Sequence, residues 1–188
     1  MRRSAVVYTV LACHMAVALV GDGPGFLMST YPRTVASVGA VVVRDDALLV
    51  VRMTYSPTRG QYMLPGGVVE SGETLDATVV REVREETGVE ARPVGIIGVN
   101  SIVYEGETHT YVLWLMELVG GEPLADGCEV DHCCFLSFDE IEARNDVAYL
   151  VKYVSGRLRT GVYTMLEPVI DYAELLPGVT ADTWKLHM

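Results

Sequence analysis

The stretch from Gly67 to Val89, GVVESGETLDATVVREVREETGV, constrains the fold and the chemistry of this chain more than any other. Its glycines predict a loop, and a helical pattern then begins near Thr74 and stops at Gly88. Apolar residues recur at helical spacing within it and predict a flank that packs against a core. These residues are Leu75, Val79, Val80 and Val83.

Acidic residues crowd onto one turn of the same predicted helix. Glu82, Glu85 and Glu86 project within an arc of about 100°, because a helix has roughly 3.6 residues per turn. Carboxylates this close repel one another unless a cation lies among them, and the candidates are Arg81 and a hard divalent metal ion. A solvated acidic face is the ordinary interpretation of such a run. The glycine loop favours a binding site instead, because bare backbone can approach a ligand closely.

The residues of this stretch also keep a fixed spacing. Five residues separate Gly67 from Glu73, seven separate Glu73 from Arg81, and the run REVREETGV begins at Arg81. This pattern resembles the signature box of the Nudix hydrolases and matches it at every defining position. The resemblance implies an α/β fold, the Nudix α/β/α sandwich with a mixed sheet between helices.

The resemblance further implies a hydrolase that depends on Mg²⁺, for which Mn²⁺ can substitute, and that cleaves the pyrophosphate linkage of a nucleoside diphosphate derivative. Such a reaction needs the phosphate charge neutralised and a water activated, and a carboxylate-bound metal ion does both. The implied metal ligands are Gly66, through its carbonyl, and Glu82, Glu85 and Glu86. Two residues are expected to brace them. Arg81 would orient Glu82 or Glu73, and Glu73 would fix the loop to the helix.

The general base and the substrate contacts are less closely determined by the box. Glu82 within the box and Glu129 in the acidic loop DGCEVDH are the candidates for the base, and an exposed loop carboxylate is the simpler interpretation of Glu129 alone. Arg52 and Arg59 flank the substrate side of the glycine loop, so each is a weak candidate for binding phosphate. Tyr104 lies where dinucleoside-polyphosphate hydrolases of this family have a tyrosine, which makes it a weak candidate too. The implied catalytic set is Glu82, Glu85, Arg81 and Glu129.

Composition narrows the expected partners. The formal net charge of −11 argues against a sequence-independent grip on a nucleic-acid backbone. We therefore expect a small-molecule nucleotide as substrate, with neither nucleic acid nor membrane as partner. The 4 cysteines show no CxxC spacing and predict free thiols in a reducing compartment, hence a cytoplasmic protein. Enzymes of this family are frequently dimers, so a homodimer is a further expectation.

The first residues differ in character from the rest. Arg2 and Arg3 precede an apolar run from Ala5 to Val20 that resembles a secretory signal and is short for a membrane span. The alternative interpretation is that the true start codon is Met28, because the sequence that follows it is typical of the beginning of a domain. We favour an extension that is not part of the folded domain. The expected division is an extension over 1–30, a Nudix domain over 31–160 and a helical tail over 161–188 that packs on it.

Runs of β-branched residues on both sides of the box predict strands. Asp45 and Asp46 separate two such runs and predict a tight hairpin turn. The predicted strands cover 35–44, 47–53, 62–64, 94–104, 108–119 and 132–137. Helical spacing predicts helices over 139–144, capped by Ser137 or Asp139, and over 146–158, with a weaker one over 167–176.

Two alternatives from other classes stay open. A catalytically silent Nudix-fold module that binds ligands and regulates transcription would often lose the box carboxylates and add a basic winged-helix domain. This sequence keeps the carboxylates and has no basic C-terminal bias. An isopentenyl-diphosphate isomerase departs from the standard box and relies on a Cys and Glu pair elsewhere, which we do not find. The box leaves the substrate open, and loops 54–61, 104–109 and 120–131 are expected to select it.

Overall fold

The computed structural model describes residues 34–55, 57–104, 107–161, 163–166, 168–170 and 186–187. The predicted N-terminal extension lies outside these described residues. In chain order the elements are β1 (Thr34–Arg44), β2 (Ala47–Met53), β3 (Tyr62–Met63), α1 (Leu75–Thr87), β4 (Glu90–Tyr104), β5 (Glu107–Gly120), β6 (Val130–Ser137), α2 (Phe138–Ala143), α3 (Tyr149–Thr160), β7 (Pro168–Ile170) and β8 (Leu186–His187).

The hairpin predicted at Asp45-Asp46 is confirmed. Both aspartates adopt positive φ angles, 48° and 58°, and β1 and β2 pair antiparallel on either side of them. Two successive left-handed residues match the right-handed twist of the flanking strands, and aspartate tolerates that conformation better than bulkier residues do. This turn ends β1 and directs the chain into the second part of the sheet.

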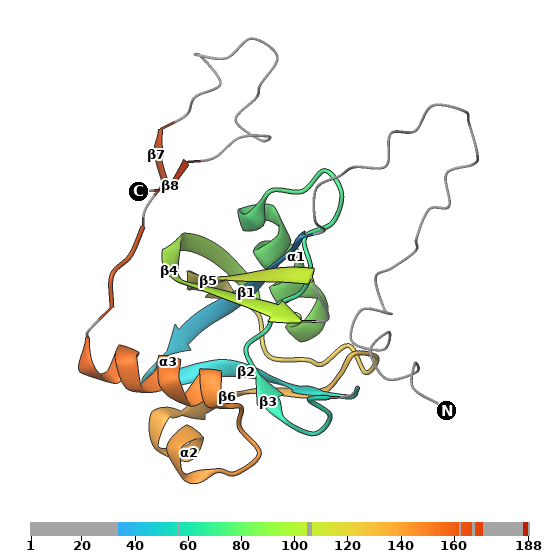
Figure 1. Ribbon diagram of the computed structural model, residues 1–188. Helices are drawn as coiled ribbons and strands as arrows, with labels where there is room; N and C mark the ends of the chain where they lie inside the picture. Colours follow the sequence, from blue (N-terminus) through green and yellow to red (C-terminus); the bar gives the residue numbers. More distant parts are fainter. Residues whose placement is uncertain are drawn as a thin grey trace, which may run out of the picture.

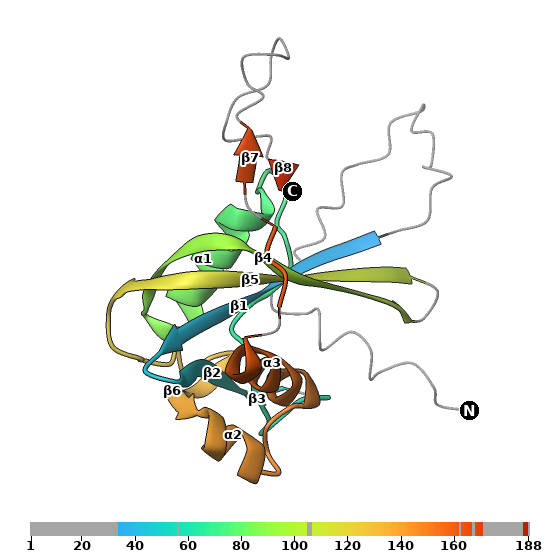
Figure 2. The ribbon, with the colours of Figure 1, turned by 90° about the vertical axis from the view of Figure 1, so that its left-hand side faces the viewer.

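The strands form one mixed sheet with the order β3-β2-β1-β5-β4, and β6 pairs with β2. β1 runs parallel to β5 over nearly its whole length, whereas β4 and β5 are antiparallel. Figures 1 and 2 show α1 on one side of this sheet and α2 and α3 on the other. The predicted α/β fold with a mixed sheet and helices is therefore confirmed.

Alternation along β1 supplies both faces of the sheet with apolar side chains. Val38, Ala40 and Val42 pack with α1, whereas Val41 packs with α2 and α3. The indole of Trp114 in β5 is fully buried on the α1 side. Its role is thus that of a core residue, as its place in an apolar strand predicts.

Helix α1 begins after Thr74 and ends at Gly88, as the sequence predicts. Gly88 adopts a φ of 66°, and its amide donates to the carbonyl of Arg84, which is the usual left-handed helix ending. The predicted apolar flank is wrong at one position, because Val80 is 37% exposed. Glu82 and Glu86 are buried instead. The helix therefore turns its acidic side, and not only its apolar side, toward the sheet.

Both helices predicted after β6 are present, but α3 begins at Tyr149, so the predicted helix over 146–158 is wrong at residues 146–148. Ser137 caps α2 through a capping box with Glu140. The predicted helix over 167–176 is wrong at residues 168–170, which form β7 and pair with β8. A proline at position 168 and β-branched neighbours favour strand over helix there. The rest of that predicted helix lies outside the described residues. Within the described part of the chain, no helix has the length and apolar character needed to cross a membrane.

Candidate active site

The glycine loop before α1 runs alongside β1 and is held there by backbone hydrogen bonds. The amide of Val38 donates to the carbonyl of Gly67 over 2.9 Å, and the amide of Ala40 donates to that of Pro65 over 2.7 Å. A Cβ at Gly67 would lie 2.2 Å from Oε1 of Glu82. Glycine at that position therefore lets the loop backbone lie directly on a carboxylate.

Two of the predicted metal ligands form a buried acidic pair under this loop. Glu82 is 5% exposed and Glu86 is 4% exposed. Oε2 of Glu86 accepts a hydrogen bond of 2.9 Å from the amide of Gly66. Burial raises the pKa of Glu86 well above its ordinary value, the bond from Gly66 opposes this rise, and the charge of Glu82 adds to it. Buried carboxylates of this kind are unfavourable unless a cation neutralises them.

Arg81 joins several of the carboxylates, as expected from the box. Its Nε donates to Oε1 of Glu73 over 2.7 Å and its second guanidinium nitrogen donates to Oε2 of Glu73 over 2.9 Å. The remaining nitrogen donates to Glu82 over 2.8 Å and to Glu85 over 3.1 Å. The bidentate bond to Arg81 lowers the pKa of Glu73 to about 2. The predicted contacts of Arg81 with Glu73 and Glu82 are thus present.

Glu85 lies apart from the buried pair. Its side chain is 54% exposed and is directed to Arg81. Consistent with this, the described residues contain no group of three or more His, Cys, Asp or Glu side chains placed closely enough to bind one metal ion. The donor chemistry nevertheless fits a hard divalent cation, because Glu82 and Glu86 present buried carboxylate oxygens close together, and Arg81 bonds to Glu82 but not to Glu86. At Gly66 the contact present is made by the amide, and the role of its carbonyl stays a prediction.

The acidic loop before β6 approaches the same site. Oδ1 of Asp126 accepts hydrogen bonds from the amides of Cys128 and Val130, over 2.9 and 3.0 Å, and so fixes the shape of the loop. Glu129, the distal candidate for the base, is close enough for its charge to raise the pKa of Glu86, and Asp126 acts in the same direction. The structure therefore brings the loop carboxylates toward the helix carboxylates.

The three weak substrate candidates have different surroundings. Arg52 donates from Nε to Oδ1 of Asp131 over 2.7 Å, so its guanidinium is engaged by a neighbouring carboxylate. Arg59 is exposed in the loop between β2 and β3. Tyr104 is the last residue of β4, and its side chain lies outside the described part. These surroundings do not connect any of the three residues with Glu82 and Glu86.

Sequence reasoning missed Tyr111, which lies near the buried pair. Burial raises the pKa of this phenol, and the charges of Glu86 and Glu82 raise it further. A Cβ at Gly39 would lie 1.9 Å from the phenol oxygen, so the ring occupies the space above that glycine. No local pattern signals this arrangement, because Tyr111 and Gly39 meet only through the parallel pairing of β5 with β1.

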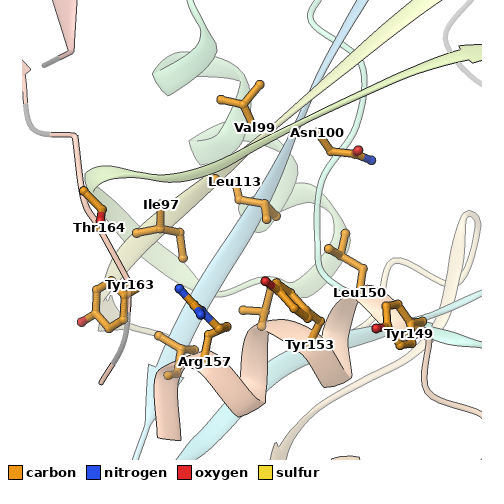
Figure 3. Close-up of a pocket in the computed structure, with 13 residues that line it drawn as sticks. Ile97, Val99, Asn100, Leu113, Tyr149, Leu150, Tyr153, Arg157, Tyr163 and Thr164 are labelled. Carbon is orange, nitrogen blue, oxygen red and sulfur yellow. The ribbon is translucent and has the colours of Figure 1, made fainter. Parts of the chain in front are cut away.

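A pocket opens on the other face of the sheet, between α3 and strands β4 and β5 (Figure 3), with a volume of about 640 Å³. Tyr149 and Tyr153 stack along α3, with ring centroids 6.5 Å apart. They are also unusually open for aromatic residues, at 81% and 55% exposed. Asn100 and Arg157 supply polar groups to a lining that is otherwise mostly apolar and aromatic.

Comparisons with known proteins agree with this geometry. Residues 33–154 match the family model of the NUDIX domain. An ADP-ribose pyrophosphatase of Methanocaldococcus jannaschii is 32% identical over 94 residues, which cover 49% of this chain and 56% of the relative. The NAD-capped RNA hydrolase NudC of Stutzerimonas stutzeri is 33% identical over 135 residues, covering 68% of this chain and 47% of the relative. The chain thus spans about half the length of these relatives.

Solved structures show the same architecture. A NUDIX hydrolase from Nitrosomonas europaea superimposes with a TM-score of 0.62 and 25% sequence identity, covering 71% of this chain and 93% of that structure. A MutT NUDIX hydrolase from Burkholderia pseudomallei superimposes with a TM-score of 0.59 over 67% of this chain and 98% of that one. At 22% identity, the second likeness concerns the fold alone.

Proposed function

Since this chain belongs to the Nudix family, we propose that it hydrolyses the pyrophosphate linkage of a nucleoside diphosphate joined to another group. The observation that carries this proposal is the pair of buried carboxylates, Glu82 and Glu86, beneath the backbone of Gly66 and Gly67. Two carboxylates side by side are rare in a structural core, even with Arg81 bonded to one of them. A phosphate site built around a divalent cation uses such carboxylates as ligands. Relatives are named as an ADP-ribose pyrophosphatase and a NAD-capped RNA hydrolase, and both ADP-ribose and NAD contain a pyrophosphate linkage.

We assign the metal ligands to Glu82 and Glu86, joined by Glu85 and the carbonyl of Gly66. When bound, Mg²⁺ or Mn²⁺ supplies charge neutralisation for the phosphates and lowers the pKa of a water ligand. Arg81 holds Glu82 in place and keeps Glu73 against the loop, so it positions the ligands and does not itself bind substrate. Glu85 has to turn from Arg81 to reach the site, and its exposed position leaves room for that rotation.

The general base remains a choice between Glu82 and Glu129. Glu82 is buried and bound to Arg81 over 2.8 Å, which favours a charged ligand that accepts no proton. Glu129 is only partly buried and sits on a loop whose charges already act on Glu86. We therefore assign the base to Glu129. Proton removal by a group beside the metal, and not by a metal ligand, keeps the ligand set intact during the reaction.

The group attached to the diphosphate would extend toward the pocket between α3 and β4. A volume of about 640 Å³ lies in the range of small-molecule sites, which is roughly 300–1,000 Å³. The faces of Tyr149 and Tyr153 suit a planar ring, and the amide of Asn100 can both donate and accept hydrogen bonds. A nucleoside is the class of group that combines these needs.

Incubation of the full chain with a panel of diphosphates tests the proposed function. The panel contains ADP-ribose, ADP-sugars, dinucleoside polyphosphates, nucleoside triphosphates, NAD and coenzyme A, each with Mg²⁺, with Mn²⁺ and with a chelator. We expect metal-dependent release of two phosphate-containing products from at least one of them, identified by chromatography. A ligand-binding module would instead bind a member of the panel without cleaving it, which is the outcome that would overturn hydrolysis.

Several expectations from the sequence stay predictions. These are the division into an extension, a domain over 31–160 and a tail, the homodimer, the cytoplasmic location and the absence of a nucleic-acid partner. The last of these needs a direct check, because several relatives are named as hydrolases of NAD-capped RNA. A short RNA carrying that cap belongs in the same panel.

A further inference from the structure

Tyr111 reaches from β5 across the neighbouring strand. Its Cα is paired with that of Ser37 in β1, while its ring lies over Gly39, two residues further along. A Cβ at Gly39 would be 1.9 Å from the phenol oxygen and 2.4 Å from the ring carbon that bears it. Any side chain at Gly39 would expel the ring, so the glycine is what permits this position.

Gly39 is also in contact with the glycine loop. A Cβ at Gly66 would lie 2.8 Å from the Cα of Gly39 and 2.0 Å from the carbonyl oxygen of Val38. The amide of Gly66 in turn donates to Glu86. Tyr111, Gly39, Gly66 and Glu86 thus form a continuous series of contacts from β5 to the carboxylates. The charges of Glu86 and Glu82 act on the phenol, in agreement with this proximity.

The hydroxyl of Tyr111 differs from that of Tyr62, another tyrosine of the same core cluster. The Tyr62 hydroxyl forms a hydrogen bond of 3.0 Å with Nδ1 of His132. Within the described part of the chain, no protein group forms a hydrogen bond with the Tyr111 hydroxyl, and this hydroxyl is not fully enclosed. It is therefore open to water, and a ligand that displaces the water can take its place as a hydrogen-bond partner.

We propose that Tyr111 is a substrate-binding residue whose hydroxyl donates a hydrogen bond to an oxygen of the diphosphate lying against Gly66. The inference rests on the proposed function, because it places a diphosphate at the Glu82 and Glu86 pair. The phenol hydroxyl carries a proton that it can donate, whereas the oxygens of a diphosphate only accept. A neutral donor can approach the diphosphate without adding to the negative charge of the site.

The test compares two deletions of a single hydroxyl, Tyr111→Phe and Tyr62→Phe, in the full chain. The probe is α,β-methylene ADP with Ca²⁺, a diphosphate that cannot be cleaved between its phosphorus atoms, and binding is measured by calorimetry. Loss of a hydrogen bond to a charged oxygen should weaken binding by about tenfold or more in Tyr111→Phe. Its melting temperature should stay unchanged, because no protein partner is lost.

Tyr62→Phe should show the reverse pattern, with a lower melting temperature and unchanged affinity, because its hydroxyl bonds only within the fold. Equal affinity of Tyr111→Phe and the unmodified chain would overturn the inference. Failure of the unmodified chain to bind the probe, together with no hydrolysis of any diphosphate, would overturn the proposed function and the inference with it.

Hydrolysis gives a second readout for Tyr111→Phe. For the diphosphate that the unmodified chain cleaves, KM should rise by a factor similar to the loss of affinity, while the metal concentration for half-maximal activity stays the same. A purely structural role would lower the melting temperature and leave KM unchanged. Gly39→Ala should reproduce the rise in KM, because the added methyl group displaces the phenol.

Discussion

Helices α1 and α3 cover opposite faces of the same sheet, yet they break the usual rules of burial in opposite ways. α1 buries Glu82 and Glu86, whereas α3 leaves Tyr149 and Tyr153 open to solvent. Charged side chains are rarely buried and large aromatic ones are rarely this exposed. We infer that the two helices have different functions: α1 carries the residues that bind metal and phosphate, and α3 carries those that bind the ring of the nucleoside.

Removal of a buried charge from α1 should have the largest effect. Glu86→Gln, and separately Glu85→Gln, should lower kcat by about 100-fold or more, because a metal ligand loses its charge. The fold should persist in Glu86→Gln, since the amide oxygen can still accept from Gly66. Steady-state kinetics and circular dichroism measure the two effects. The exposed Glu90→Gln is the control, and near-normal activity in both ligand variants would contradict the mechanism.

The brace formed by Glu73 and Arg81 should have the next largest effect, on stability. Arg81 lowers the pKa of Glu73 from its ordinary 4.5 to about 2, which corresponds to about 3 kcal/mol at most. A carboxyl group with a lowered pKa stabilises the fold at pH values above its ordinary pKa. This stabilisation is lost as pH falls from 4.5 toward 2. Glu73→Gln should therefore be less stable than the unmodified chain at pH 7.

Urea unfolding at a series of pH values measures this difference, which should shrink as the pH falls below 4.5. The exposed Glu142→Gln serves as the control, with little change at any pH. A gap between Glu73→Gln and the unmodified chain that stayed constant down to pH 3 would show that the carboxylate acts by packing and not by charge.

The rotation of α1 toward its acidic side can be tested on two adjacent valines. Val79 is fully buried and Val80 is 37% exposed. Val79→Ala should lower the free energy of unfolding by about 2 kcal/mol, because it leaves a cavity in the core. Val80→Ala should change it by less than about 0.5 kcal/mol. Equal effects in chemical denaturation would mean that the simple apolar stripe describes the helix after all.

The smallest effect is expected on α3. Tyr153→Leu removes one aromatic face from the pocket and should raise KM for a nucleotide substrate by about 2- to 10-fold, with kcat little changed. Val119→Ala, at an exposed apolar residue outside the pocket, is the control. A fall in kcat without a change in KM would place Tyr153 in the chemistry of α1 and contradict the inferred difference in function between the two helices.

Local patterns predicted most of what lies within one element or between neighbours in the chain. The hairpin at Asp45-Asp46, the limits of α1 and the capping of α2 each depend on a few adjacent residues. The contacts of Arg81 with Glu73 and Glu82 were also predictable, because helical geometry and a fixed loop bring these residues together. The strand at 168–170 was missed because its partner, β8, lies far away along the chain.

The sequence by itself determined the box, its helix and the acidic residues that this helix carries, because their relative positions follow from helical spacing and short loops. Only the tertiary structure decided that Val80 lies outside the core and that Tyr111 lies over Gly39, near the carboxylates. The physical reason is that burial and long-range contact depend on which strands pair. Here the parallel pairing of β1 with β5 brings the phenol of Tyr111 over Gly39, and the loop at Gly66 connects that place to Glu86 of the helix.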